Sequence, residues 1–222
     1  MLNENHKRFI KTLEGLAGRR SVVDAFSDVC AALACGIEQL SPNPQEREER
    51  FASTMAKYDA DDRRVFGQLL AIVVEALDLR RESFLGPVLE EIGAANSRNG
   101  QFLTPVVLAK LMGRIVGTPT VAAEKHRPGE LVTLNDPACG AGVLMIQSAE
   151  ELVQAGVQKS DIYILAGDID IRACDMTFIE LSLLGYAARI EHRDALSMKE
   201  YSRPRYTPGF YLYGTQWREK RG

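Results

Sequence analysis

Three aspartates lie where a protein of alternating strands and helices could bind a ligand. Asp136 opens the run Asp-Pro-Ala-Cys-Gly-Ala-Gly that ends at Gly142, Asp168 lies in Gly-Asp-Ile-Asp, and Asp194 follows His-Arg. Gly140 and Gly142 permit positive φ angles and let a ligand approach the main chain closely. A helix beginning after such a turn offers free N–H groups to an anion, and carboxylates accept hydrogen bonds from hydroxyl groups. The pattern predicts a site for a ligand that carries a ribose.

The glycine turn alone does not identify the ligand, because tight strand-to-helix turns also use glycine for purely structural reasons. A dinucleotide-binding fold requires a third glycine three residues after the second, and Met145 occupies that position here. A phosphate-binding loop of the Walker type requires Gly-Lys-Ser/Thr, which the run lacks. These departures disfavour NAD, FAD and nucleoside triphosphates.

Apolar runs around the aspartates predict the elements that position them. Strands alternating with helices imply parallel pairing with right-handed crossovers, and such sheets bind ligands at the carboxyl ends of their strands. We therefore expect an α/β fold with a Rossmann-like sheet, which could be truncated. The predicted elements are a strand Leu131–Asn135, a helix Gly142–Ala155, a strand Ile162–Ala166, a helix Ile171–Leu184 and a strand Ala187–Glu191.

The first 95 residues have apolar side chains at three- and four-residue steps, which predicts a series of packed helices. Ser21 is a candidate N-cap for one helix, and Asp61 and Asp62 precede another at Arg63–Leu79. Thr104 and Pro105 are a strong start signal for a helix over 106–116. We predict a helical region at 1–95, a ligand-binding domain at 96–200 and an aromatic, basic tail at 201–222.

The composition is that of a globular protein, with 45% hydrophobic and 26% charged residues and a net charge of −3. A non-specific nucleic-acid binder would carry a basic excess, so DNA contacts would need a local basic patch or a partner chain. The four cysteines form no CxxC pair, which disfavours a zinc site and a disulfide framework. No apolar run reaches membrane-spanning length, and we predict a cytoplasmic protein.

Three motifs in order resemble the N6-adenine DNA methylases, the family of the modification subunit of type I restriction systems. They are Gly100-Gln-Phe-Leu-Thr-Pro105, the glycine run from Asp136 to Gly142, and Asp168-Ile-Asp170, and the resemblance covers about residues 84–200. It implies an S-adenosylmethionine-dependent methyltransferase that acts on DNA, alone or within a restriction-modification complex. Short phage- and plasmid-borne members of the family are similar to this chain in their tails.

The resemblance also implies roles for individual residues around S-adenosylmethionine. Asp168 would bind the ribose, Ile169 the face of the adenine, and Asp194 would lie near the adenine amino group. One set of residues would close over the methionine end of the cofactor. A second set would hold the methionine and the sulfonium. The first set is Gln101, Phe102, Thr104 and Pro105, and the second is Asp136, Ala138, Gly140 and Gly142.

The catalytic signature of that family, an Asn/Asp-Pro-Pro-aromatic loop after the fourth strand, is missing from the 222 residues. Ser41-Pro-Asn-Pro44 lacks the aromatic residue and lies between predicted helices, so we reject it as a substitute. Two interpretations stay open. The chain is a fragment or one subunit of an adenine-N6 methyltransferase whose other parts are supplied elsewhere, or it is a short member of the family that binds the cofactor without methylating and regulates or completes another methylase. A partner subunit or a second copy of the chain is compatible with either interpretation. No catalytic residue is assigned.

The tail after Asp194 contains prolines and many aromatic and basic residues, and its secondary structure is not predictable. Its side chains could form a platform for nucleic acid, but we favour packing across the exposed edge of the sheet. The residues concerned are Arg203, Arg205, Tyr206, Tyr211, Tyr213, Trp217, Arg218 and Arg221.

Overall fold

We describe the fold from a computed structural model, which covers residues 2–18, 20–40, 43–94, 106–116 and 130–219. The side chains at 106, 107, 110, 116 and 215–219, and that of residue 94, lie outside this description. The motif residues Gln101, Phe102, Thr104 and Pro105 and the side chain of Trp217 are therefore not placed. No helix in the described ranges is both long and apolar enough to span a membrane.

The N-terminal region is helical, as its apolar periodicity predicts. Ser21 caps its helix by accepting a hydrogen bond from the Asp24 N–H at 3.0 Å. The helix expected to begin at Arg63 begins one turn earlier, because Asp59 caps it through the N–H groups of Asp61 and Asp62. The helices are α1 (Glu4–Ala17), α2 (Val22–Ile37), α3 (Pro44–Met55), α4 (Ala60–Leu79) and α5 (Leu85–Ala94).

The second part of the chain alternates between strands and helices and forms a parallel sheet in the order β1-β2-β3, which confirms the predicted α/β class. Every predicted element is present, with ends that differ by at most three residues. The elements are α6 (Val106–Val116), β1 (Val132–Asp136), α8 (Val143–Gln154), a 3-10 turn η1 (Lys159–Asp161), β2 (Ile162–Asp168), α9 (Ile171–Leu183) and β3 (Ala187–Asp194).

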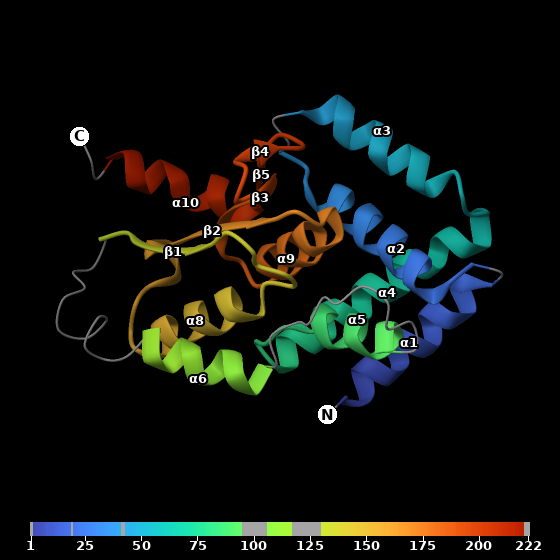
Figure 1. The fold of residues 1–222 in the computed structure, drawn as a ribbon, viewed down its shortest axis with the longest axis horizontal. Coiled ribbons are helices and arrows are strands. Elements are labelled where there is room, and N and C mark those ends of the chain that lie inside the picture. Colours follow the sequence, from blue (N-terminus) through green and yellow to red (C-terminus); the bar gives the residue numbers. More distant parts are fainter. Residues whose placement is uncertain (1, 19, 41–42, 95–105, 117–129, 220–222) are drawn as a thin grey trace.

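The tail closes the outer edge of β3. The short strands β4 (Lys199–Glu200) and β5 (Arg205–Tyr206) pair antiparallel with β3, and α10 (Pro208–Glu219) packs beside them (Figure 1). A Cβ atom at Gly209 would lie 2.6 Å from the Tyr186 carbonyl oxygen, so α10 approaches the sheet backbone closely. Packing of the tail on the sheet is confirmed, and Arg205 is buried rather than free for nucleic acid.

Buried polar contacts join the N-terminal helices to the sheet domain, and one hydrophobic core runs from Phe9 to Ile190. Asp175 in α9 accepts hydrogen bonds from Arg50 in α3 and from Arg205 in β5. Glu180, also in α9, is fully buried and accepts from the N–H groups of Phe84 and Leu85 at 2.7 and 2.5 Å. Burial raises the pKa of Glu180 to about 7. The helical region is thereby held against α9, which packs on β2 and β3.

Candidate cofactor site

The glycine turn between β1 and α8 has the backbone geometry that its sequence predicts. Gly140 and Gly142 have φ angles of 53° and 73°, in the left-handed region that favours glycine. Gly142 is the N-cap residue of α8. A Cβ atom at Gly142 would lie 2.9 Å from Oγ1 of Thr177, a buried residue of α9. The turn is therefore fitted closely to α9, and a larger residue at Gly142 would displace it.

Asp168, at the end of β2, fastens the glycine turn to the second strand. One carboxylate oxygen accepts from the Gly140 N–H and the other from the Asp170 N–H, each at 2.9 Å. The Cys139 N–H donates to the Gly167 carbonyl at 2.9 Å, so two bonds connect the turn to β2. Each Asp168 oxygen keeps a further lone pair, and the half-buried side chain can still accept from a ligand hydroxyl.

Thr177, in α9, contacts the same turn. Its hydroxyl donates to the Gly140 carbonyl at 3.0 Å and lies 3.6 Å from the Cys139 sulfur. Cys139 is buried, and burial raises the pKa of its thiol to about 12. The thiol is therefore protonated at neutral pH and is no nucleophile. Thr177 could not be identified from a local pattern, because the contact joins residues that are 37 positions apart.

Asp136 and Ile169 lie at neighbouring strand ends on either side of this turn. The Asp136 carboxylate accepts from the Ala138 N–H at 3.1 Å and so orders the first residues after β1. Ile169 follows Asp168, and 55% of its surface is exposed although its side chain is apolar. An exposed branched side chain beside a carboxylate suits the flat apolar face of a base next to a ribose. The residues present thus fit a nucleoside.

The end of β3 contributes a residue that the sequence did not single out. His192 is opposite Asp168 in the β2–β3 register, and its Nε2 lies 3.1 Å from the Ile169 carbonyl oxygen. The His192 ring also faces the Tyr201 ring, with centroids 5.0 Å apart. The alternation of β3 could have indicated His192, since it lies two residues before Asp194 and therefore on the same face.

Asp194 lies beyond these residues, as the last residue of β3, where the chain turns toward β4. Its carboxylate accepts from the Ser197 hydroxyl at 2.7 Å and from the N–H groups of Leu196 and Ser197. The hydrogen bond from the Ser197 hydroxyl and those from the two N–H groups lower the pKa of Asp194. The structure brings Asp136, Gly140, Asp168 and Ile169 together, whereas Asp194 is occupied in closing its own turn. Its predicted contact with adenine stays a prediction.

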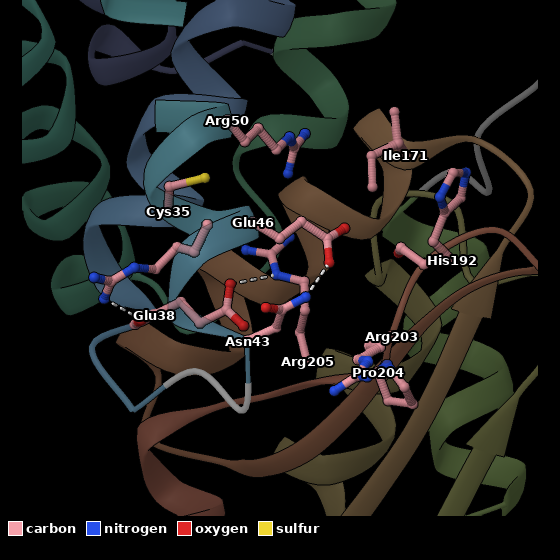
Figure 2. A pocket seen from close by; sticks show the side chains of 12 residues that line it. Cys35, Glu38, Asn43, Glu46, Arg50, Ile171, His192, Arg203, Pro204 and Arg205 are labelled. Atoms are coloured by element: carbon pink, nitrogen blue, oxygen red, sulfur yellow. Dashed lines mark hydrogen bonds and ion pairs between the residues drawn. The ribbon is translucent and has the colours of Figure 1, made fainter. Parts of the chain in front are cut away.

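A separate cavity of about 210 Å³ lies next to the site, between α3, β3 and the segment that leads into β5. Figure 2 shows His192 and Ile171 on the side away from Cys35 and Glu38, with the Arg205 guanidinium bonded to Glu38. Its lining includes four arginines, but Arg50 and Arg205 are already paired with Asp175. Asp136, Gly140 and Asp168 do not line it, so it is distinct from the glycine-turn site.

In the described ranges, no cluster of His, Cys, Asp and Glu side chains could hold a metal ion. The described groups of the glycine-turn site can bind and orient a ligand through carboxylates, N–H groups and an apolar surface. No nucleophile is among the residues that form this site in the described part of the chain.

Comparison with known proteins agrees with the resemblance seen in the motifs. Residues 87–208 match the family model described as N-6 DNA methylase. A Listeria monocytogenes protein described as a class I S-adenosylmethionine-dependent methyltransferase is similar in structure, with a TM-score of 0.47 and 14% sequence identity. The similarity covers 98% of this chain and 70% of that one. No curated protein sequence matches the chain.

Proposed function

The chain belongs to the N-6 DNA methylase family, and on that basis we propose that it binds S-adenosylmethionine at the carboxyl ends of β1 and β2 for methylation of adenine N6 in DNA. One observation carries the proposal: Asp168 both fastens the glycine turn and keeps acceptor capacity next to an exposed Ile169. This arrangement supplies an acceptor for a ribose and an apolar contact for a base within two consecutive residues.

The residues of this chain would act by binding and orientation. Asp168 would accept from the ribose hydroxyls, and Ile169 would lie against the adenine ring. Asp136, Ala138 and the turn at Gly140 would hold the methionine end, where the two carboxylates also favour the positive sulfonium. When bound, S-adenosylmethionine supplies an activated methyl group to the acceptor amine. Close positioning of that group is the contribution that the described residues can make to the reaction.

A second function, a cofactor-binding module that completes or regulates another methylase, is favoured by a sequence observation. The 222 residues contain no Asn/Asp-Pro-Pro-aromatic run. In this family that loop accepts hydrogen bonds from the target amine and stacks on the flipped base. A partner or a larger restriction-modification complex would then supply the loop and the contacts with DNA.

Replacing Ile169 by alanine should weaken binding of S-adenosylmethionine by roughly five- to thirtyfold, because about 1–2 kcal/mol of apolar contact with the base is lost. The side chain is largely exposed, so folding should be unaffected. Titration calorimetry with S-adenosylmethionine and S-adenosylhomocysteine measures the effect. Leu79→Ala, at another exposed apolar residue, is the matched control. Equal affinity of the wild type and Ile169→Ala would place the base elsewhere.

Methyl transfer by the purified chain alone separates the two functions. We expect the chain to bind the cofactor but to transfer no tritiated methyl group to unmethylated DNA, since the loop that accepts the target base is missing from its sequence. Transfer should appear when proteins encoded beside it are co-expressed. Robust transfer by the chain alone would show that its own residues replace the loop, and the module interpretation would then be abandoned.

A further inference from the structure

The junction between α4 and α5 crosses from the helical region onto the sheet domain. It comprises residues 81–86 and ends at the second residue of α5. At its start, the Arg81 guanidinium donates to both oxygens of the Glu150 carboxylate in α8, at 2.8 and 2.9 Å, and to the Leu184 carbonyl at 3.0 Å. Glu150 is buried and also accepts from the Tyr186 hydroxyl at 2.7 Å. The start of the junction is therefore fixed to α8 and to the end of α9.

The other end of the junction is fixed by Glu180 of α9. One oxygen of this fully buried carboxylate accepts from two N–H groups where α5 begins, those of Phe84 and Leu85, at 2.7 and 2.5 Å. The first N–H groups of a helix have no partner within the helix, so an acceptor at this place both satisfies and orients them. The first turn of α5 therefore cannot move along α9 without breaking these two bonds.

Gly86, the last residue of the junction, lies directly behind the glycine turn. A Cβ atom at Gly86 would lie 3.0 Å from the Cβ atom of Ala141 and 3.5 Å from Cγ2 of Val143. Ala141 is 1% exposed and stands between the two glycines that have positive φ angles. Glycine allows the backbone many conformations, so a contact behind Ala141 restricts a turn that is otherwise flexible. The Ala141 methyl group fits there because residue 86 has no side chain.

Two residues on one face of α9 fix the glycine turn from two sides. Thr177 donates to the Gly140 carbonyl at 3.0 Å and so contacts the turn directly. Glu180 holds the junction, and the junction in turn contacts Ala141. Residues three apart are neighbours on a helix surface, so any movement of α9 is transmitted to both contacts. The position of the turn thus depends on the helical region as well as on the sheet.

We propose that the junction is a part of the cofactor site, in which Gly86 and Glu180 are positioning residues that hold the glycine turn in the conformation that binds S-adenosylmethionine. The inference rests on the proposed function, because it concerns the same site. Both residues are buried, so they act through Ala141 and not on the ligand. Ala141 is bonded to Gly140 and Gly142, and a shift of its backbone moves the N–H groups that face the ligand.

Gly86→Ala changes this contact by one methyl group. The φ angle of Gly86 lies outside the left-handed region, and at such a helical position alanine is normally the more favourable residue. A Cβ atom cannot rotate away, so the turn or α5 has to move, and we expect S-adenosylmethionine to bind about tenfold more weakly. Titration calorimetry measures the affinity. Gly93→Ala, in the same helix, is the matched control, because a Cβ atom there meets nothing within 4 Å in the described part of the chain. It should bind like the wild type.

The same substitution in an Ala141→Gly background separates positioning from general destabilisation. Residues in contact have coupled effects, so without the Ala141 methyl group Gly86→Ala should change the affinity by less than about twofold. Unchanged affinity of Gly86→Ala in the wild-type background would overturn the inference. An equal loss in both backgrounds would also overturn it, since the effect would then not pass through Ala141.

A second pair of variants tests the anchor on α9 and decides the matter if Gly86→Ala does not fold. Glutamine at position 180 keeps an oxygen that accepts from the two N–H groups, whereas alanine leaves both without an acceptor. Glu180→Ala should weaken cofactor binding about tenfold and Glu180→Gln less than about threefold, with circular dichroism showing that each variant is folded. Equal affinity of Glu180→Ala and the wild type would contradict the positioning role. Absence of cofactor binding by the wild type would contradict the proposed function instead.

Discussion

Asp175→Asn is expected to lower the free energy of unfolding by about 3–5 kcal/mol, the cost of leaving buried charges without their partner. The Asp175 side chain is almost inaccessible to solvent. It accepts from both terminal nitrogens of Arg50, at 2.9 and 2.5 Å, and from Arg205 at 2.7 Å. An asparagine has the same shape but presents one acceptor and no charge to two guanidinium groups.

Urea denaturation followed by circular dichroism measures this loss. Glu48→Gln is the matched control, because Glu48 also pairs with an arginine, Arg47, but its side chain is 72% exposed. Exposed pairs of this kind contribute about 0–1 kcal/mol. If the two variants lost the same stability, Asp175 would not be the centre of the contact between the helical region and the sheet.

Gly142→Ala is expected to weaken S-adenosylmethionine binding by about a hundredfold or more. A left-handed backbone costs a residue with a side chain about 1–2 kcal/mol. The new methyl group would also lie 2.9 Å from the Thr177 hydroxyl, which holds the Gly140 carbonyl. Both effects move the turn that faces the ligand, and small displacements in such a site reduce binding strongly.

Gly156→Ala separates backbone strain from this displacement. Gly156 has a φ of 95°, but a Cβ atom there meets nothing within 4 Å, and the residue lies at the other end of α8. It should lower stability by about 1 kcal/mol and leave the affinity for the cofactor unchanged. Titration calorimetry measures the affinity of both variants for the cofactor. An equal loss of affinity would mean that general destabilisation, and not the turn, limits binding.

The strands and helices around the glycine turn could be predicted because each has a clear local signal. Apolar runs of strand length end at Asp136 and Asp168, and amphipathic helices follow them. Local signals also place Gly140 and Gly142 in the turn, since only residues 137–142 separate the strand from the helix. The fold class and the choice of Asp136, Gly140, Gly142 and Asp168 as candidate residues therefore rest on local patterns, each within about ten residues.

The parts that could not be predicted depend on contacts between distant residues. Asp175 and Glu180 have the sequence appearance of ordinary helix charges, yet their partners lie 125 and 96 positions away. The tail has weak local periodicity, and β4 and β5 are only two residues long, so β3 and not the tail sequence determines their pairing. Within the described part of the chain β1 pairs along one edge only, which is a property of the sheet and has no local signal.

The pairing of Arg205 with Glu38 has a consequence for how the protein is made. The two residues are 167 positions apart, and both are buried. Ribosomes add about 5–20 residues per second, so α2 waits roughly 10–30 s for the arginine that neutralises its last turn. Until Arg205 has been added, Glu38 and, once it has been synthesised, Asp175 lack this arginine as a partner. We expect the N-terminal helices to stay loosely packed during translation and to become protease-resistant only once β5 has docked.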